Sequence, residues 1–325
     1  MRFCRYKERK MFEHKEYVER IYQERSFRKA AEKLHVSQPA LSAMIKRLEK
    51  ELGVPLFNRK TNPISLTSFG SEYLKSAGIV TDLESRLKNM AYEDRTALYG
   101  TLTLCAFSLA LPTRIARKIA AFHASFPGIR LYLQNHNTLQ AKMSMDSYQG
   151  DLLISTKNMD PEKYTGISLY QEHLVLVVPK RFSDTERFTD LQLDSKQISS
   201  ILEPDCPALP LKDFQSVPFI LASRENYIRE CANMLFQEAQ IHPPVEIETE
   251  SSSVALNFVR LGCGATICSH MLLENTAYAN QLCVYKIKSR LAVRTGHLYY
   301  RRGAYLTPAM KKFIAWMQEP DPTEE

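Results

Sequence analysis

The most regular pattern of hydrophobic and polar positions lies between residues 37 and 53. Four apolar residues recur there at the spacing of one helix face: Leu41, Ile45, Leu48 and Leu52. The opposite face is small, hydrogen-bonding or cationic: Gln38, Pro39, Ser42, Ala43, Lys46 and Arg47. Ser37 is a good N-cap and Gly53 suits a helix end, so we expect a helix between them. Such a helix fits the major groove of DNA, although an ordinary amphipathic surface helix shows the same pattern.

The segments around this helix predict a helix-turn-helix with a wing. Residues 12–24 predict one helix, and Ser26 is expected to cap a second over 27–35. A tight turn then leads into the third helix, which is the helix-turn-helix order. After Gly53, a basic, turn-rich loop over 58–63 precedes an alternating segment, 64–67, that predicts a strand. We expect this hairpin to hold its basic residues near phosphates; a merely solvated loop is the alternative.

A long helix is predicted from about residue 68 to residue 92, with a seam of the coiled-coil kind. The seam residues are Tyr73, Val80, Leu83, Leu87 and Met90. Because the helix is otherwise polar, we expect it to pair with the same helix of a second subunit. Packing of the seam onto the chain's own body is the alternative, and Gly78 weakens the helix.

From residue 101 onward, short strands alternate with helices. Strands are expected at 101–105, 129–133, 152–155, 173–179, 218–221, 245–249, 282–287 and 297–300. Helices are expected at 111–126, from about 138, and at 228–239, 253–261 and 308–317. The first three strands and their helices predict a βαβαβ unit with a parallel sheet, and a second half begins at the apolar strand 173–179.

Charge and apolar content restrict the partners. The net charge is +7, and it lies wholly in the first third: residues 1–98 hold 20 Lys and Arg against 13 acidic residues, and 99–325 hold 23 of each. This predicts a polyanion partner for the first third only. No apolar run approaches the roughly 20 residues of a membrane span. Residues 1–10 are basic without an apolar core behind them, so we expect a cytoplasmic protein with no membrane partner.

The cysteines and the remaining motifs argue against several kinds of chemistry. Seven scattered cysteines without a Cys-x-x-Cys pair match neither a disulfide framework nor a zinc site. Cys206 is the candidate for a redox switch, although Glu203 and Asp205 beside it would raise its pKa. Residues 99–325 contain no glycine-rich phosphate loop and no Gly-x-Ser-x-Gly elbow. We therefore predict no catalytic residues, no metal and no cofactor, and a protein that is not an enzyme.

The order of residues from 26 to 70 resembles the signature of the LysR-type transcriptional regulators. The residues that carry it are Ser26-Phe27, Ala30-Ala31-Glu32-Lys33-Leu34-His35-Val36-Ser37-Gln38-Pro39-Ala40-Leu41-Ser42, Ile45, Leu48-Glu49, Leu52-Gly53, Leu56-Phe57, Arg59, Leu66-Thr67 and Gly70. Shorter landmarks extend the resemblance over nearly the whole chain: Gly150-Asp151-Leu152, Leu261-Gly262-Cys263-Gly264 and Phe313. About ten basic residues precede the usual start, so either Met11 is the true initiator instead of Met1 or residues 1–10 form a disordered arm that touches DNA. Cys263 within the glycine turn is unusual and leaves open what that turn contacts.

The resemblance implies an α/β fold class with an N-terminal winged helix-turn-helix, a linker helix, and a two-subdomain α/β effector domain like periplasmic binding proteins. The expected boundaries are 1–67 for the winged helix (1–10 as a basic extension), 68–97 for the dimerising linker and 98–325 for the effector domain. Subdomain I would comprise about 98–172 and 275–325, and subdomain II about 173–274. The implied partners are double-stranded DNA with an interrupted palindromic operator, a small-molecule effector and further copies of the chain, as a homodimer or homotetramer. RNA polymerase is a further candidate partner.

The implied DNA-contacting residues divide by their chemistry. Glutamine can bond adenine in the major groove and proline can touch a thymine methyl group, whereas lysine and arginine hold phosphates without reading sequence. The residues expected to face base edges are Gln38, Pro39, Ser42 and Lys46. Those expected to hold phosphates are Arg28, Lys29, Ser37, Arg47, Arg59 and Lys60.

The implied effector site lies between the two α/β halves, where strand ends meet helix starts. Helix N-termini there present free amides, which suit a carboxylate, so an organic anion is the expected ligand. The expected site residues are Phe107, Ser108, Asn137, Thr138, Ser223, Ala265 and Thr266. Each residue taken alone could be only a helix cap. His173, near the crossover, could sense charge, but a structural histidine is the preferred interpretation.

Three functions of other kinds are weighed against this one. They are an enzyme fused to a DNA-binding module, as in some biotin ligases, a regulator switched by the Cys206 thiol, and a nucleoid-type binder without a ligand. The missing catalytic motifs argue against the first. An oxidant response that depends on Cys206 would favour the second, and a footprint that no metabolite alters would favour the third.

Overall fold

The computed structural model describes residues 11–319 apart from 60, 62, 93–98, 108–112, 137 and 274–281. The chain divides into two compact units. The first contains the residues up to 94 together with 146–149, and the second contains the rest.

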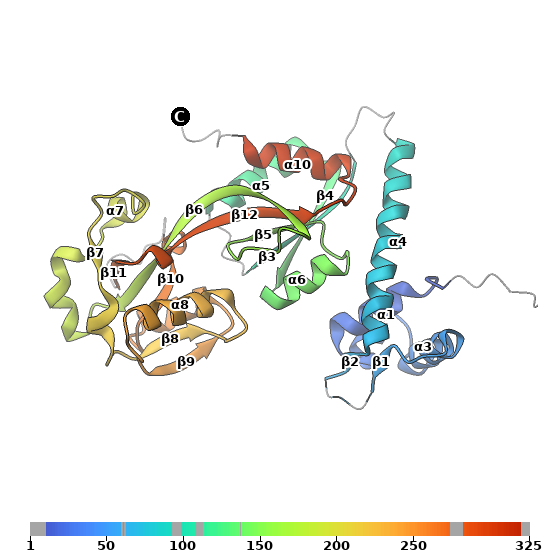
Figure 1. Ribbon diagram of the computed structural model, residues 1–325, viewed down its shortest axis with the longest axis horizontal. Helices are drawn as coiled ribbons and strands as arrows, with labels where there is room; N and C mark the ends of the chain where they lie inside the picture. The colour runs from blue at the N-terminus through green and yellow to red at the C-terminus, as the bar shows by residue number, and fades with distance from the viewer. Residues whose placement is uncertain are drawn as a thin grey trace, which may run out of the picture. The chain divides into compact units, whose positions relative to one another are not determined.

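The N-terminal unit is a small helical core with a two-stranded hairpin and a long final helix (Figure 1). Its elements are α1 (Lys15–Glu24), α2 (Phe27–Lys33), α3 (Gln38–Leu52), β1 (Phe57–Asn58), β2 (Ser65–Leu66) and α4 (Ser68–Tyr92). Leu41 and Ile45 of α3 are fully buried in one cluster with Val18 of α1 and Ala30 of α2. β1 and β2 pair antiparallel, which confirms the predicted wing.

Subdomain I of the C-terminal unit contains the predicted βαβαβ segment. Its elements are β3 (Gly100–Phe107), α5 (Thr113–Ser125), β4 (Ile129–His136), α6 (Thr138–Asp146), β5 (Leu152–Ser155) and, from the end of the chain, α10 (Pro308–Gln318). β3 pairs parallel with both β4 and β5, as predicted. α10 packs against α5, where Phe122 and Phe313 meet edge to face at 4.9 Å between ring centroids. The final helix therefore completes a core that begins near residue 100.

Two long strands cross between the subdomains. β6 (Tyr164–Pro179) and β12 (Val293–Arg301) run antiparallel side by side, with a register shift after Gly296 (Figure 1). The beginning of β6 corrects the prediction, which had the strand start at residue 173. The missed half, 164–172, is mostly exposed or half-buried and alternates only weakly, and its pairing partner lies more than a hundred residues away.

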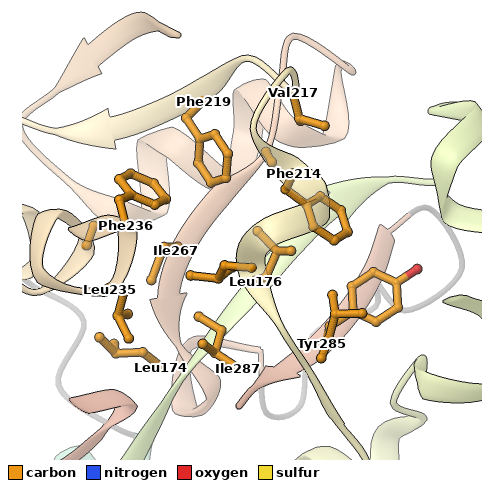
Figure 2. Close-up of a cluster of buried hydrophobic side chains, with 14 of the residues drawn as sticks. Leu174, Leu176, Phe214, Val217, Phe219, Leu235, Phe236, Ile267, Tyr285 and Ile287 are labelled. Carbon is orange, nitrogen blue, oxygen red and sulfur yellow. The ribbon is translucent and has the colours of Figure 1, made fainter. Parts of the chain in front are cut away.

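Subdomain II contains the remaining elements. Its strands are β7 (Ala208–Leu209), β8 (Phe219–Ala222), β9 (Val245–Thr249), β10 (Thr266–Ser269) and β11 (Leu282–Ile287). Its α-helices are α7 (Ser195–Ser199), α8 (Tyr227–Glu238) and α9 (Ser252–Arg260), and its 3-10 helices are η1 (Ser183–Leu191), η2 (Leu211–Phe214), η3 (His270–Leu272) and η5 (Arg290–Ala292). Figure 2 shows the aromatic and aliphatic side chains of one of its two main apolar clusters.

The position of β11 corrects the predicted subdomain boundary. β11 pairs with β6 and β7, and its residues Tyr285 and Ile287 lie in the subdomain II core (Figure 2). The chain therefore returns toward subdomain I after residue 287, rather than at about residue 275. The two crossings thus lie on β6 and β12, which are paired with each other.

Candidate nucleic-acid interface and ligand site

α3 begins and ends as its local sequence predicts. The Ser37 hydroxyl accepts a hydrogen bond from the Ala40 amide at 3.3 Å, and Pro39 occupies the first turn, where no intrahelical donor is lost. Gly53 ends the helix at φ +77°, a left-handed conformation that favours glycine. These caps fix the length and direction of the helix that carries the proposed base contacts.

The outer face of α3 is available to a partner. Gln38, Pro39, Lys46 and Arg47 are exposed and Ser42 is half-buried, whereas Leu41, Ile45 and Leu48 are buried on the opposite face. The geometry therefore brings all four predicted base-reading residues to one exposed surface. We call this surface, defined by Gln38, Pro39, Ser42 and Lys46, the reading surface.

The cationic side chains around the reading surface differ in their ion pairs and in their exposure to solvent. Arg28 and Arg47 pair with glutamates one turn along their own helices, at 3.4 and 3.2 Å, while both arginines remain 80% exposed. Exposed pairs of this kind contribute little, about 0.3–0.5 kcal/mol, so these guanidinium groups can exchange the glutamate for a phosphate. Lys29 is exposed on α2, and Lys60 lies outside the described residues.

Arg59 forms a less exposed ion pair than Arg28 and Arg47 do. Its guanidinium pairs with Glu49 of α3 at 2.9 Å and lies 5.1 Å from the centre of the Phe27 ring. Glu49 is more buried than the exposed partners of Arg28 and Arg47, with a 13% exposed side chain, so this pair is harder to exchange. The phosphate contact expected of Arg59 therefore stays a prediction, and it would compete with an ion pair that the guanidinium already forms inside the N-terminal unit.

The predicted seam on α4 divides into two parts. Tyr73 is 4% exposed, contacts Phe12 and donates its hydroxyl proton to the Met11 carbonyl at 2.9 Å, so its own chain accounts for its burial. Leu83 and Leu87 are 49% and 67% exposed, and Val80 is half-buried. The side chain of Met90 lies outside the described residues. The part of the seam that remains open to a second copy is thus centred on Leu83 and Leu87.

The predicted ligand residues also divide. Phe107 ends β3 and Thr138 begins α6, but nothing is described of their side chains, and Ser108 and Asn137 lie outside the described residues. Ser223 follows β8, and its hydroxyl accepts from the Asn226 side chain at 2.8 Å just before α8. This places Ser223 at a strand-to-helix junction, as expected.

Thr266 and Ala265 depart from the predicted ligand role. Both are buried, and the Thr266 hydroxyl donates to the Ile220 carbonyl at 2.7 Å. The Ala265 amide donates to the Pro218 carbonyl at 2.8 Å, and the Ala265 carbonyl accepts from the Ile220 amide. Their polar groups join β8 to the turn that begins β10, so we correct their assignment from ligand contacts to internal ones.

A buried polar cluster lies where the two long strands cross. Glu172 of β6 forms an ion pair with Arg294 of β12, and Ser269 donates to the same carboxylate at 2.6 Å. Arg294 also donates to the Cys231 sulfur at 3.7 Å and lies 5.8 Å from the Tyr227 ring centre in α8. No sequence signal identified this cluster, because Glu172 and Arg294 are 122 positions apart and only the β6–β12 register brings them together.

His173 occupies a structural position beside this cluster. Its side chain is 3% exposed, its Nδ1 lies 2.7 Å from the Leu174 carbonyl oxygen, and burial lowers its pKa to about 4. It is therefore neutral at ordinary pH, which supports the structural interpretation over charge sensing.

Cys206, the candidate redox thiol, is half-buried, whereas Cys263 is exposed. Burial raises the pKa of the half-buried Cys206 thiol, which reduces the reactive thiolate. Within the described ranges, no group of three or more His, Cys, Asp or Glu side chains could hold a metal ion. Over the same ranges, no helix has both the length and the apolar character to cross a membrane.

Comparisons with known proteins agree with this geometry. Residues 12–71 match the family described as "Bacterial regulatory helix-turn-helix protein, lysR family", and residues 96–320 match the "LysR substrate binding domain". An uncharacterized HTH-type transcriptional regulator, YcgK of Bacillus subtilis, is 28% identical over 79% of each chain. The hydrogen peroxide-inducible genes activator of Dickeya chrysanthemi is 25% identical over 90% of this chain and 89% of its own.

Solved structures show the same fold. Full-length OxyR from Pseudomonas aeruginosa, solved as a point variant, superposes with a TM-score of 0.63 at 22% identity, covering 94% of this chain and 95% of its own. CbnR, a LysR family transcriptional regulator, gives a TM-score of 0.58 at 19% identity, with 94% and 97% covered.

Proposed function

The chain belongs to the LysR family of transcriptional regulators. We propose that its reading surface recognises a DNA operator and that an organic anion, bound in the C-terminal unit, controls this regulator. The observation that carries the DNA half is the two-sided character of α3. Its apolar face is buried in the core, whereas Gln38, Pro39 and Lys46 on the polar face are exposed. One relative, CbnR, has been solved in complex with its target DNA.

The chemistry of the reading surface sets which contacts discriminate between sequences. The Gln38 amide can form two bonds with adenine, and the apolar ring of Pro39 can pack on a thymine methyl group. Arg28, Lys29 and Arg47 lie at its margins and supply phosphate contacts that depend on salt. Two reading surfaces related by a two-fold axis would read an interrupted palindrome.

Pairing of two chains is proposed to use the outer part of α4. Leu83 and Leu87 lie one helical turn apart on the same face and are both exposed in the single chain. Two exposed leucines one turn apart favour burial against an identical helix. Pairs of dimers joined through the C-terminal units would give the tetramer.

The ligand is proposed to be a small organic anion held where strands end and helices begin. The beginning of α8 supports this, because Ser223 accepts from Asn226 and keeps its own hydroxyl proton for a ligand. The first amides of α8 add a positive helix end. Among structures of similar fold, the effector binding domain of QuiR is in complex with shikimate and the regulatory domain of CcmR is in complex with 2-PG.

The DNA proposal is tested with a duplex that the wild-type protein enriches from random DNA. Ser42→Ala and Gln38→Ala should weaken binding to this duplex by about 1–3 kcal/mol while leaving binding to a scrambled duplex nearly unchanged. Arg47→Ala should weaken binding to both duplexes alike and reduce the salt slope by about 1. Equal losses on both duplexes for Ser42→Ala would refute the reading surface.

The ligand proposal needs a separate test. A set of small organic acids is screened for a rise in the melting temperature of the C-terminal unit, since a ligand that binds only the folded state stabilises it. Ser223→Ala should remove the shift given by an active acid while leaving DNA binding intact. A shift that survives Ser223→Ala would exclude this junction as the site.

A further inference from the structure

Glu49 joins the reading helix to the wing through three hydrogen bonds. Its Oε1 accepts from the backbone amides of Leu56 and Phe57 at 2.9 and 3.2 Å, and its Oε2 accepts from Arg59 at 2.9 Å. Its carboxylate therefore contacts β1 at the Phe57 amide and the residues on either side of β1 at the Leu56 amide and the Arg59 side chain. Because the carboxylate is charged, each of these bonds is stronger than a neutral one.

The other side of the same backbone segment is fastened to α4. The Leu56 carbonyl accepts from the Thr67 amide at 2.9 Å, and the Thr67 hydroxyl donates to the Pro55 carbonyl at 2.7 Å. Gly70 in the first turn of α4 lies so close that a Cβ there would come within 2.0 Å of the Leu56 carbonyl oxygen. Leu56 is fully buried, and its backbone is hydrogen-bonded both to Glu49 of α3 and to Thr67 at the start of α4.

These contacts form a continuous link from the reading helix to the linker helix. Glu49 lies on α3, Leu56 on the connecting segment, and Thr67 immediately before α4. No apolar or solvent gap separates them, because each step is a hydrogen bond of ordinary length. A change at one end of this link would therefore alter the position of the other end.

We infer that Glu49 is a positioning residue for DNA recognition: it sets the angle of the wing and of α4 to the reading surface without touching DNA itself. Arg59 is its counter-charge, held in place by Phe27. The inference rests on the proposed DNA-reading function. It makes the sequence specificity of binding, and not only its strength, depend on an acidic residue.

The test compares Glu49→Gln with the matched variant Glu51→Gln. Both remove one negative charge from the same helix, but Glu51 pairs with the exposed Arg47 and forms none of the wing contacts described above. Affinities are measured for the enriched duplex and for a scrambled duplex of equal composition, over a series of salt concentrations. Thermal unfolding confirms that each variant is folded.

Glu49→Gln should lower the ratio of the two affinities about tenfold, the loss expected from one charged hydrogen bond in the link. Glu51→Gln should strengthen binding to both duplexes equally and leave the ratio unchanged, because it removes a negative charge and weakens the pair with Arg47 without changing the contacts of Glu49 with the wing. Arg59→Gln should lower the ratio as Glu49→Gln does, and the double variant should lose no more than either single variant, since the two side chains act as a pair.

Two results would overturn the inference. An unchanged ratio in folded Glu49→Gln would remove the positioning role, and equal falls in both glutamate variants would reduce the effect to charge. A failure of the wild-type protein to enrich any duplex is a different result, because it refutes the proposed DNA-reading function itself.

Discussion

Acid should destabilise the C-terminal unit through two histidines buried beside the strand crossing. His173 and His270 are each 3% exposed, and the His173 amide donates to Nδ1 of His270 at 3.0 Å. Burial lowers the pKa of His173 to about 4, against the opposing effect of its hydrogen bond to Leu174, and burial also lowers the pKa of His270. Glu172, Lys286 and Arg114 act on these rings as well, but burial is the largest cause.

The sign and size of the effect follow from linkage. An unfolded histidine titrates near 6.5, so between that pH and about 4 the unfolded chain binds more protons than the folded one. The contribution of the two neutral histidines to the free energy of unfolding is therefore fully present above about pH 6.5, and it is lost as the pH falls toward about 4. For His173 alone, the loss reaches roughly 2.5 kcal/mol near pH 4.5.

The assay is urea unfolding followed by the fluorescence of Trp316, the single tryptophan, which lies in α10 of the same unit. His173→Asn is the comparison, because an asparagine amide can donate as Nδ1 does but does not titrate. The wild-type protein should lose roughly 2.5 kcal/mol more than this variant between neutral pH and about pH 4.5. Carboxylates titrate alike in both proteins, so parallel losses would refute the role given to His173.

Three further predictions concern single side chains. Lys118→Met should lower the melting temperature, because the buried ammonium donates to two carbonyl groups at the end of α10. Losing these two hydrogen bonds costs about 2 kcal/mol, so an unchanged melting curve would contradict the prediction. Leu87→Lys should shift sedimentation toward the monomer, whereas Ile79→Lys, outside the seam, should not; dimers that persist in Leu87→Lys would exclude this face. Cys206→Ser should keep any response to hydrogen peroxide, since burial raises the pKa of the thiol; a response abolished by the substitution would revive the thiol switch.

The parts of the molecule that the sequence could predict depend on local signals. The limits of α3 follow from a serine cap, a proline in the first turn and a glycine in a left-handed conformation, all within the helix or one residue of it. The βαβαβ segment follows from strand and helix periodicities that alternate over short distances. The reading surface could be predicted from the helical period alone, because the apolar positions of α3 mark its buried face and the remaining positions are then expected to be exposed.

The parts that could not be predicted depend on contacts between distant residues. Heptad spacing cannot distinguish Tyr73, buried by its own chain, from Leu87, which remains exposed. In the sequence Arg59 is simply a cationic residue in a loop, and its ion pair with Glu49, ten positions away, follows only from the fold. Thr266 lies next to a glycine turn that resembles a ligand loop, yet its hydroxyl is needed by the Ile220 carbonyl.

The order in which the crossing strands leave the ribosome has a consequence for folding. β12 lies between β5 and β6 in the sheet, and α10 covers the core begun by β3, yet both follow the whole of subdomain II along the chain. Subdomain I therefore cannot complete its fold until the whole of subdomain II, which is inserted between its two parts along the chain, has been translated. Contacts of such long range slow folding and leave apolar strands exposed in the meantime. Nascent chains should thus depend on chaperones until the sequence beyond residue 301 has emerged.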